Sequence, residues 1–239
     1  MYVVLFDIDG TLVKTGGAGQ TAFLDTFRED LGVTEMPGDI SFAGRSDRAI
    51  AEEIMRVSGL ESSEELWQRF YAGYTGRIEK ALSTCQGEIL PGILPLLDAL
   101  KQLDHVLVGL LTGNVERGAQ AKLAHYGIAD RFAFGGFGDL RTDRDDIAAD
   151  AWQAAARYLA ARNGHTIGEV MVIGDTPNDV TCARSIGAFA VAVATGGNTS
   201  EELAATKPDL VLDDLSDTDA LLAEVQAHAP RTRNLAAKP

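Results

Sequence analysis

Cysteine is scarce in this chain, which carries only Cys85 and Cys182 among its 239 residues. Two distant cysteines form neither a disulfide framework nor the paired spacing of a zinc site. Histidine is equally sparse, and its four positions have no metal-ligand spacing: His105, His125, His165 and His228. The sequence therefore excludes a disulfide-stapled miniprotein and a zinc-finger type of protein.

Positive charge is in short supply, because 21 Lys and Arg residues face 35 Asp and Glu residues, for a formal charge of −14. No run of Lys or Arg forms a local exception. This balance repels phosphate backbones and anionic lipid headgroups, so we expect neither nucleic acid nor a membrane as a partner. A phosphorylated substrate would meet the same repulsion. A phosphate site in this chain must therefore concentrate cations and N–H groups locally, with the help of a metal.

Long hydrophobic runs are also missing. The first apolar run, Tyr2–Phe6, ends at Asp7 and is too short for a signal sequence or a membrane span. We expect a cytoplasmic protein. Hydrophobic residues make up 46% of the chain and charged residues 23%, which is typical of a globular protein.

Short apolar runs alternate with helical stretches along most of the chain. The runs predict buried parallel strands, and the stretches between them predict helices at Gly92–Lys101, Asp145–Ala161 and Pro177–Ile186. This alternation is typical of an α/β fold with a doubly wound parallel sheet, which binds ligands at the carboxyl ends of its strands. The predicted strands are Val3–Phe6, Val106–Leu111, Val170–Ile173, Ala188–Ala194 and Leu210–Leu212.

One interval interrupts the alternation. Residues 16–87 contain no convincing strand and three helical patterns, at Gln20–Leu31, Ser46–Ser58 and Ser63–Leu82, with hinge-like glycines at both edges. We predict an inserted α-helical domain at 16–87 and a discontinuous core domain at 1–15 and 88–239. Aromatic residues at helical spacing predict the core of the insertion: Trp67, Phe70, Tyr71 and Tyr74.

The strongest chemical signal is Asp7-Ile8-Asp9-Gly10-Thr11, directly after the first strand. Two acids at this spacing can have different roles. One can attack phosphorus, while the other donates a proton to the leaving oxygen and later activates water. The structural alternative is an ordinary acidic turn, because Asp-Gly is a common turn dipeptide.

Two further strands end in polar groups. Thr112-Gly113-Asn114 offers a hydroxyl and backbone N–H groups for a phosphate, although it is also a good strand exit and helix cap. Gly174-Asp175-Thr176-Pro177-Asn178-Asp179 adds two carboxylates on a strand-to-helix turn. Oxygen ligands without nearby His or Cys favour Mg²⁺. The structural alternative is that Asp175 caps the following helix.

These motifs, in this order and spacing, resemble those of the haloacid dehalogenase superfamily, and the insertion lies where that family places its type 1 cap. The closest likeness is to phosphoglycolate-phosphatase-like members. The resemblance implies Asp7 as nucleophile and Asp9 as general acid and base. It also implies Mg²⁺ held by Asp7, Asp175 and the Asp9 carbonyl, with Asp179 orienting a metal-bound water or a cation. Phosphate binding would fall to four residues, Gly10, Thr112, Gly113 and Asn114.

The third motif departs from the family, because the usual lysine is missing from Asp139–Asp146. We predict that Arg144 supplies the positive charge, with Arg141 as the alternative. In the insertion, Arg45 is a candidate contact for a substrate anion, although a solvated arginine beside a helix cap is an equal interpretation.

The predicted function is Mg²⁺-dependent hydrolysis of a small phosphorylated metabolite, either phosphoglycolate-like or a sugar phosphate. A sugar-phosphate mutase is the alternative, but capped mutases of the family carry a His after the first hinge and this chain has none before His105. A non-catalytic binding protein is a second alternative. The complete set of acids argues against it, because clustered carboxylates repel one another. The sequence makes no prediction of oligomeric state.

Overall fold

A parallel sheet forms the centre of the protein in the computed structural model, which describes residues 1–38, 40–162 and 165–228. The strand order is β5-β4-β1-β6-β7-β8, and every neighbouring pair is parallel. The predicted doubly wound sheet is confirmed. The strands are β1 (Tyr2–Phe6), β4 (Val106–Leu111), β5 (Gly135–Gly136), β6 (Glu169–Gly174), β7 (Phe189–Val193) and β8 (Leu210–Leu212).

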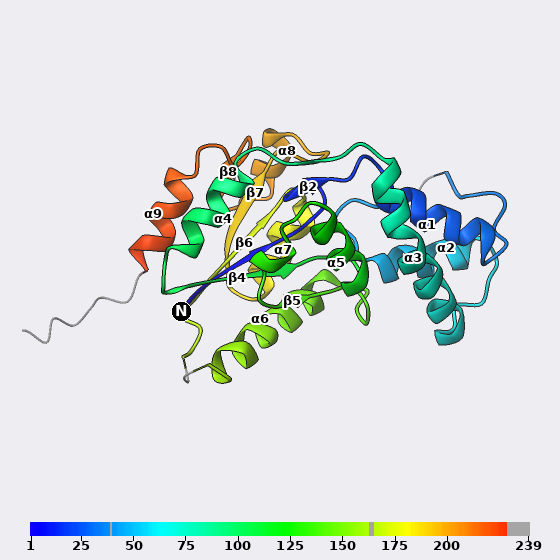
Figure 1. Cartoon of the computed structure of the whole chain (residues 1–239), viewed down its shortest axis with the longest axis horizontal. Helices are drawn as coiled ribbons and strands as arrows, with labels where there is room; N and C mark the ends of the chain where they lie inside the picture. The colour runs from blue at the N-terminus through cyan, green and yellow to red at the C-terminus, as the bar shows by residue number, and fades with distance from the viewer. Residues whose placement is uncertain (39, 163–164, 229–239) are drawn as a thin grey trace, which may run out of the picture.

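Helices cover both faces of this sheet (Figure 1). One face packs against α4 (Ile93–Lys101), α5 (Glu116–His125) and α9 (Asp219–Ala227), and the other against α6 (Arg144–Ala160), α7 (Pro177–Ser185) and α8 (Ser200–Ala205). Successive β1 side chains alternate between the two cores, with Val4 and Phe6 in one and Val3 and Leu5 in the other. Because both faces are buried, β1 is a continuous apolar run.

Strand β5 was not predicted. It consists of Gly135 and Gly136 alone, paired with Leu110 and Leu111 of β4. A side chain on Gly136 would collide with the Ile147 carbonyl of α6. The close packing of α6 on β5 therefore explains why position 136 is a glycine, a residue that strands otherwise disfavour. A short 3₁₀ helix (Ala129–Arg131) precedes it.

Three helices form an insertion between two short strands. Strand β2 (Val13–Lys14) enters it and β3 (Glu88–Ile89) leaves it, and the two pair antiparallel. Between them lie α1 (Ala18–Glu29), α2 (Asp47–Val57) and α3 (Glu64–Thr84), gathered at one end of the molecule beside the sheet (Figure 1). We call α1–α3 and their connections the helical insertion. None of the helices in the described ranges is long and apolar enough to cross a bilayer.

The helical insertion has a hydrophobic cluster of its own. Phe70 is fully buried at its centre, with ring centroids 4.5 Å from Phe23 and 5.0 Å from Phe27. Trp67 and Tyr74 are buried as predicted, whereas Tyr71 is half-buried. The division into domains 1–15 with 88–239 and 16–87 stays a prediction, and residues 229–239 lie outside the described part.

Truncating the buried ring of Phe70 should destabilise the protein strongly. We expect Phe70→Ala to lower the free energy of unfolding by about 3–5 kcal/mol, because it leaves a cavity among packed aromatic rings. Urea denaturation followed by circular dichroism measures this. Tyr71→Ala, the neighbouring half-buried ring, is the matched control and should cost clearly less. Equal losses would contradict the assignment of Phe70 to the core of the insertion.

Candidate active site

The carboxyl ends of three adjacent strands meet at one edge of the sheet. Asp7 follows β1, Thr112 follows β4 and Asp175 follows β6, and β1 lies between the other two. The Asp7 N–H donates to the Ile173 carbonyl at 3.0 Å, which continues the ladder one residue past the strand. Parallel pairing thus brings Asp7 next to two motifs that lie more than a hundred residues further along the sequence.

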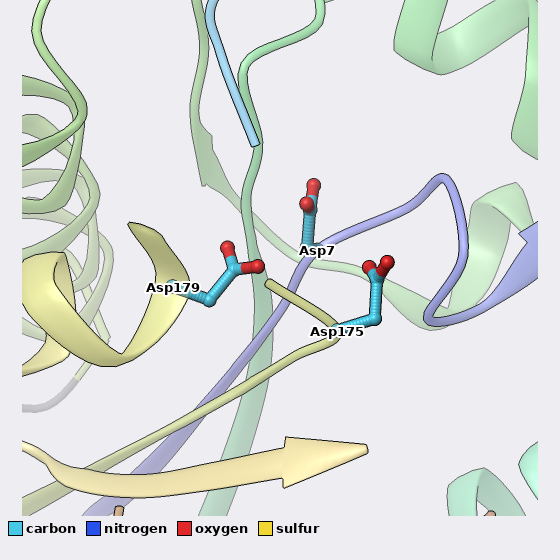
Figure 2. Close-up of side chains that lie close together, drawn as sticks. All are labelled: Asp7, Asp175 and Asp179. Atoms are coloured by element: carbon cyan, nitrogen blue, oxygen red, sulfur yellow. The ribbon is translucent and has the colours of Figure 1, made fainter. Parts of the chain in front are cut away.

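Three buried carboxylates form a cluster at this edge. Asp7, Asp175 and Asp179 each place an oxygen within 4.8 Å of the others (Figure 2). Asp175 accepts a hydrogen bond from the Thr11 hydroxyl at 2.9 Å. The N-cap of α7 is Thr176, which forms a capping box with Asp179, so the alternative interpretation of Asp175 as a helix cap is wrong.

Burial and mutual repulsion shift the acidity of this cluster. Burial raises the pKa of Asp7 to about 6; Arg144 opposes the shift and Asp179 adds to it. Burial, with Asp179 and Asp7 nearby, raises the pKa of Asp175 to about 8. Both carboxyl groups therefore hold protons more tightly than exposed acids do, which means that the site favours additional positive charge.

Arg144 supplies part of that charge. It is the first residue of α6 and is buried, with Nη1 3.7 Å from Asp7 Oδ2 and Nη2 donating to Asp179 Oδ1. Burial alone would lower the pKa of Arg144, but Asp179 and Asp7 more than offset it, so the pKa is raised. Arg141 instead donates to Asp150 at 2.8 Å on the surface. The structure thus brings Arg144 to Asp7, and Arg141 lies elsewhere.

The donor set fits a hard divalent cation. One guanidinium accompanies three buried carboxylates, and the ligand atoms are all oxygen. Asp179 already accepts hydrogen bonds from Arg144 and from the backbone and hydroxyl of Thr176. Asp7 and Asp175 are therefore the better candidate ligands, and Asp179 is suited to holding Arg144 in place.

Asp9 lies beside a lysine that the sequence analysis missed. Lys122 is 3% exposed, and its Nζ lies 2.5 Å from Asp9 Oδ2 and 2.5 Å from Asn114 Oδ1. A signal was present, because Ala119, Lys122 and Leu123 recur at helical spacing on the buried face of α5. A charge among such apolar neighbours indicates a partner inside the protein.

The helical insertion lies over the edge of the sheet that carries the acidic cluster and forms one wall of the site. A cavity of about 280 Å³ lies between the two parts. Asp47 of α2 joins the two parts: its N–H donates to the Gly113 carbonyl at 2.7 Å, and its Oδ2 accepts from the Val115 N–H at 2.8 Å. Burial raises the pKa of Asp47 to about 7, against the influence of Lys122. The lining includes Asp7, Asp9, Gly10, Gly113, Asn114, Arg144, Phe23, Phe42, Ile50 and Tyr74.

The remaining predicted residues fall in two places. Thr112 is fully buried beneath the cavity and accepts a hydrogen bond from the Asn114 amide at 2.8 Å. Arg45 lines the cavity, but its guanidinium donates within the insertion, to Glu53 at 2.5 Å and to the Ser41 carbonyl at 3.1 Å. A contact between Arg45 and substrate stays a prediction.

The raised pKa of Asp175 predicts how stability changes with pH. The folded protein retains a proton that the unfolded chain releases between the ordinary value of 3.8 and about 8, so metal-free protein loses stability as pH rises through that window. We expect metal-free Asp175→Asn to melt above wild type, by a margin that grows from pH 5 to pH 8 in thermal scans. Asp130→Asn, at an exposed aspartate, is the control variant. A margin for Asp175→Asn that stays constant with pH would contradict the prediction.

Comparison with known proteins agrees with this geometry. The sequence model of the family described as haloacid dehalogenase-like hydrolase matches residues 4–184. The phosphoglycolate phosphatase of Synechococcus elongatus is 29% identical over 219 residues, covering 91% of this chain and 95% of that protein. The phosphoglycolate phosphatase of Pectobacterium atrosepticum is 26% identical over 232 residues, covering 93% of both chains.

Solved structures share the fold. A hydrolase from Pseudomonas syringae superposes with a TM-score of 0.70 at 22% identity, covering 94% of this chain and 99% of that one. A β-phosphoglucomutase from Clostridium difficile gives a TM-score of 0.69 at 21% identity, covering 94% and 97%. The match to the family spans well over half of the sequence and includes all the strands that carry the acidic cluster, so this chain belongs to the haloacid dehalogenase-like hydrolase family.

Proposed function

We propose that this protein is a Mg²⁺-dependent phosphatase that hydrolyses a small phosphomonoester through an aspartyl-phosphate on Asp7. The observation that carries the proposal is the convergence of Asp7, Arg144 and Asp175 in one buried site beneath a cavity. A carboxylate beside a fixed guanidinium and a cation-binding cluster suits the attack of an anion on an anionic phosphoryl group.

The phosphoryl group would lie at the sheet edge. Asp7 Oδ1 accepts a hydrogen bond from the Ile8 N–H at 2.8 Å, so Oδ2, the oxygen nearer Arg144, is the candidate nucleophile. Arg144 would bind a phosphoryl oxygen and stabilise charge in the transition state. Gly10, Gly113 and Asn114 line the same cavity, where N–H and amide groups suit phosphate oxygens.

The reaction divides between two aspartates. Asp7 forms a bond to phosphorus as the bond from phosphorus to the leaving oxygen breaks, and the Asp9 carboxyl gives that oxygen its proton. Water then attacks phosphorus and releases Asp7, and the Asp9 carboxylate accepts a proton from the water. The products are inorganic phosphate and an alcohol, and both aspartates return to their starting states.

Mg²⁺ would be held by Asp7, Asp175 and the Asp9 carbonyl, and when bound it supplies positive charge to the phosphoryl oxygens. The two raised pKa values support this assignment, because burial, and to a lesser extent the neighbouring carboxylates, makes each carboxylate costly without a further positive charge. Asp179 would act through Arg144, whose guanidinium it binds.

A small substrate fits best. The cavity measures about 280 Å³ and is lined on one side by the helical insertion, which we propose acts as the cap at 16–87. Two relatives are named phosphoglycolate phosphatase, and this supports a phosphoglycolate-like substrate ahead of a sugar phosphate. The likeness to a β-phosphoglucomutase is a likeness of fold, and no His precedes His105. Hydrolysis is therefore favoured over transfer back to a sugar.

Release of inorganic phosphate from a panel of small phosphoesters tests the proposed function. We expect turnover that requires Mg²⁺, is abolished by a chelator and falls by at least about 1,000-fold in Asp7→Asn, because the variant lacks the attacking carboxylate. Circular dichroism verifies that the variant is folded. Isomerised sugar phosphate without release of phosphate would favour the mutase, and metal binding without turnover on the whole panel would favour the binding protein.

Comparing variants of Arg144 and Arg141 tests which arginine supplies the proposed positive charge. We expect Arg144→Met to lower kcat by about 100-fold or more, because it removes the guanidinium beside Asp7, and Arg144→Lys to retain part of the activity. Arg141→Met should stay near wild type, since that side chain pairs with Asp150 on the surface. Full activity in Arg144→Met, measured at saturating Mg²⁺, would contradict the role.

A further inference from the structure

The proposed reaction leaves one buried charged side chain without a role. Lys122 lies in the last turn of α5, in the lining of the cavity, and is almost fully buried. A buried ammonium group is costly unless it is paired, and removing one member of such a pair is strongly destabilising. Its partner, Asp9, is the proposed acid and base, and the side chain of Asp9 is 43% exposed.

Lys122, Asp9 and Asn114 form a closed ring of hydrogen bonds. Lys122 Nζ donates to Asp9 Oδ2 at 2.5 Å and to Asn114 Oδ1 at 2.5 Å, and Asn114 Nδ2 donates to the same Asp9 Oδ2 at 2.8 Å. Asn114 Nδ2 also lies 2.8 Å from Thr112 Oγ1, so the ring is attached to the end of β4. Each of the three side chains is thereby held in position by hydrogen bonds to the other two.

Both donors converge on one oxygen of Asp9. Oδ2 accepts from Lys122 and from Asn114, whereas no hydrogen bond from the described residues reaches Oδ1. An exposed carboxyl group without such donors would rotate freely about its side-chain bonds. The ring therefore leaves Oδ1 as the oxygen that can exchange a proton, and it limits the directions in which Oδ1 points.

The helical insertion covers the lysine of this ion pair. A Cβ on Gly19, in the first turn of α1, would lie 3.2 Å from Lys122 Nζ, so α1 packs directly against the ammonium group. Tyr74 of α3 lines the same end of the cavity. Excluding water from the ammonium group strengthens its attraction to Asp9, because the dielectric constant around Lys122 falls.

We infer that Lys122 is a positioning residue for Asp9, and this inference rests on the proposed acid and base role of Asp9. Lys122 and Asn114 hold Oδ2, so that the proton on Oδ1 passes to the leaving oxygen as the phosphorus–oxygen bond breaks. The same oxygen then accepts a proton from the water that attacks the phosphorylated Asp7. Lys122 itself exchanges no proton and touches no reacting atom.

The test exploits the fact that a weakly basic leaving group departs without a proton. We would measure kcat/KM with 4-nitrophenyl phosphate and with the best alkyl ester among phosphoglycolate, glycerol phosphate and glucose 6-phosphate. Lys122→Met keeps the length of the side chain and removes the charge. We expect its kcat/KM to fall about 100-fold with the alkyl ester and less than about 5-fold with the aryl ester.

Three further variants separate the possible outcomes. Lys101→Met, on the exposed side of α4, should behave as wild type with both esters. Lys122→Gln is the second variant if Lys122→Met does not fold, and it should show the same selective loss. Equal losses with both esters in a folded variant, or no loss with either, would overturn the inference. Turnover retained in Asp7→Asn would instead overturn the proposed function, whatever the ratio of the two losses.

Discussion

Burial of three carboxylates at the carboxyl ends of the central strands is the constraint on which the rest of the site depends. The loss of water on burial, followed by their mutual repulsion, raises the pKa of Asp7 to about 6 and that of Asp175 to about 8. Such a cluster persists in a folded protein only if cations and N–H donors surround it. Arg144, at the start of α6, is buried beside Asp7 and Asp179. The Thr11 hydroxyl donates to Asp175, and the Thr176 hydroxyl donates to Asp179.

The packing of β1 between two apolar cores offsets the unfavourable free energy of burying the three carboxylates. Strand β1 lies at the middle of the sheet with apolar cores on both faces, so Asp7 extends from one of the most buried strands in the fold. Gly10, at φ +81°, and Gly196 pass so close to Asp175 that a side chain on either would collide with the carboxylate. The surrounding backbone thus fits tightly around the acids, and their relative positions are determined before any ligand binds.

The helical insertion completes the site through a few specific contacts. Besides Asp47, Ser46 donates from its hydroxyl to the Thr142 carbonyl at 3.1 Å, and Asn178 donates to the Gly44 carbonyl at 2.7 Å. These bonds join the segment that leads into α2 to the loop before α6 and to the first turn of α7. The insertion thereby brings apolar side chains over the cavity and limits water around Lys122.

The sequence by itself determined the doubly wound sheet and the acids at its edge. Apolar runs such as Tyr2–Phe6 end directly at polar residues, and parallel strands place all their carboxyl ends on one side. Asp7, Thr112 and Asp175 could therefore be brought together from local pattern alone. The helices of the insertion were predictable for the same reason, because periodic apolar side chains require a buried face.

Only the tertiary structure decided which cations serve those acids. Arg141 and Arg144 lie three residues apart in one acidic loop, and the direction of α6 brings Arg144 to Asp7 and leaves Arg141 on the surface. Strand β5 formed from two glycines because α6 packs against it. The pair between Asp9 and Lys122 joins residues 113 positions apart. Local sequence specifies backbone conformation and burial, whereas the partner of a buried charge depends on how distant elements pack.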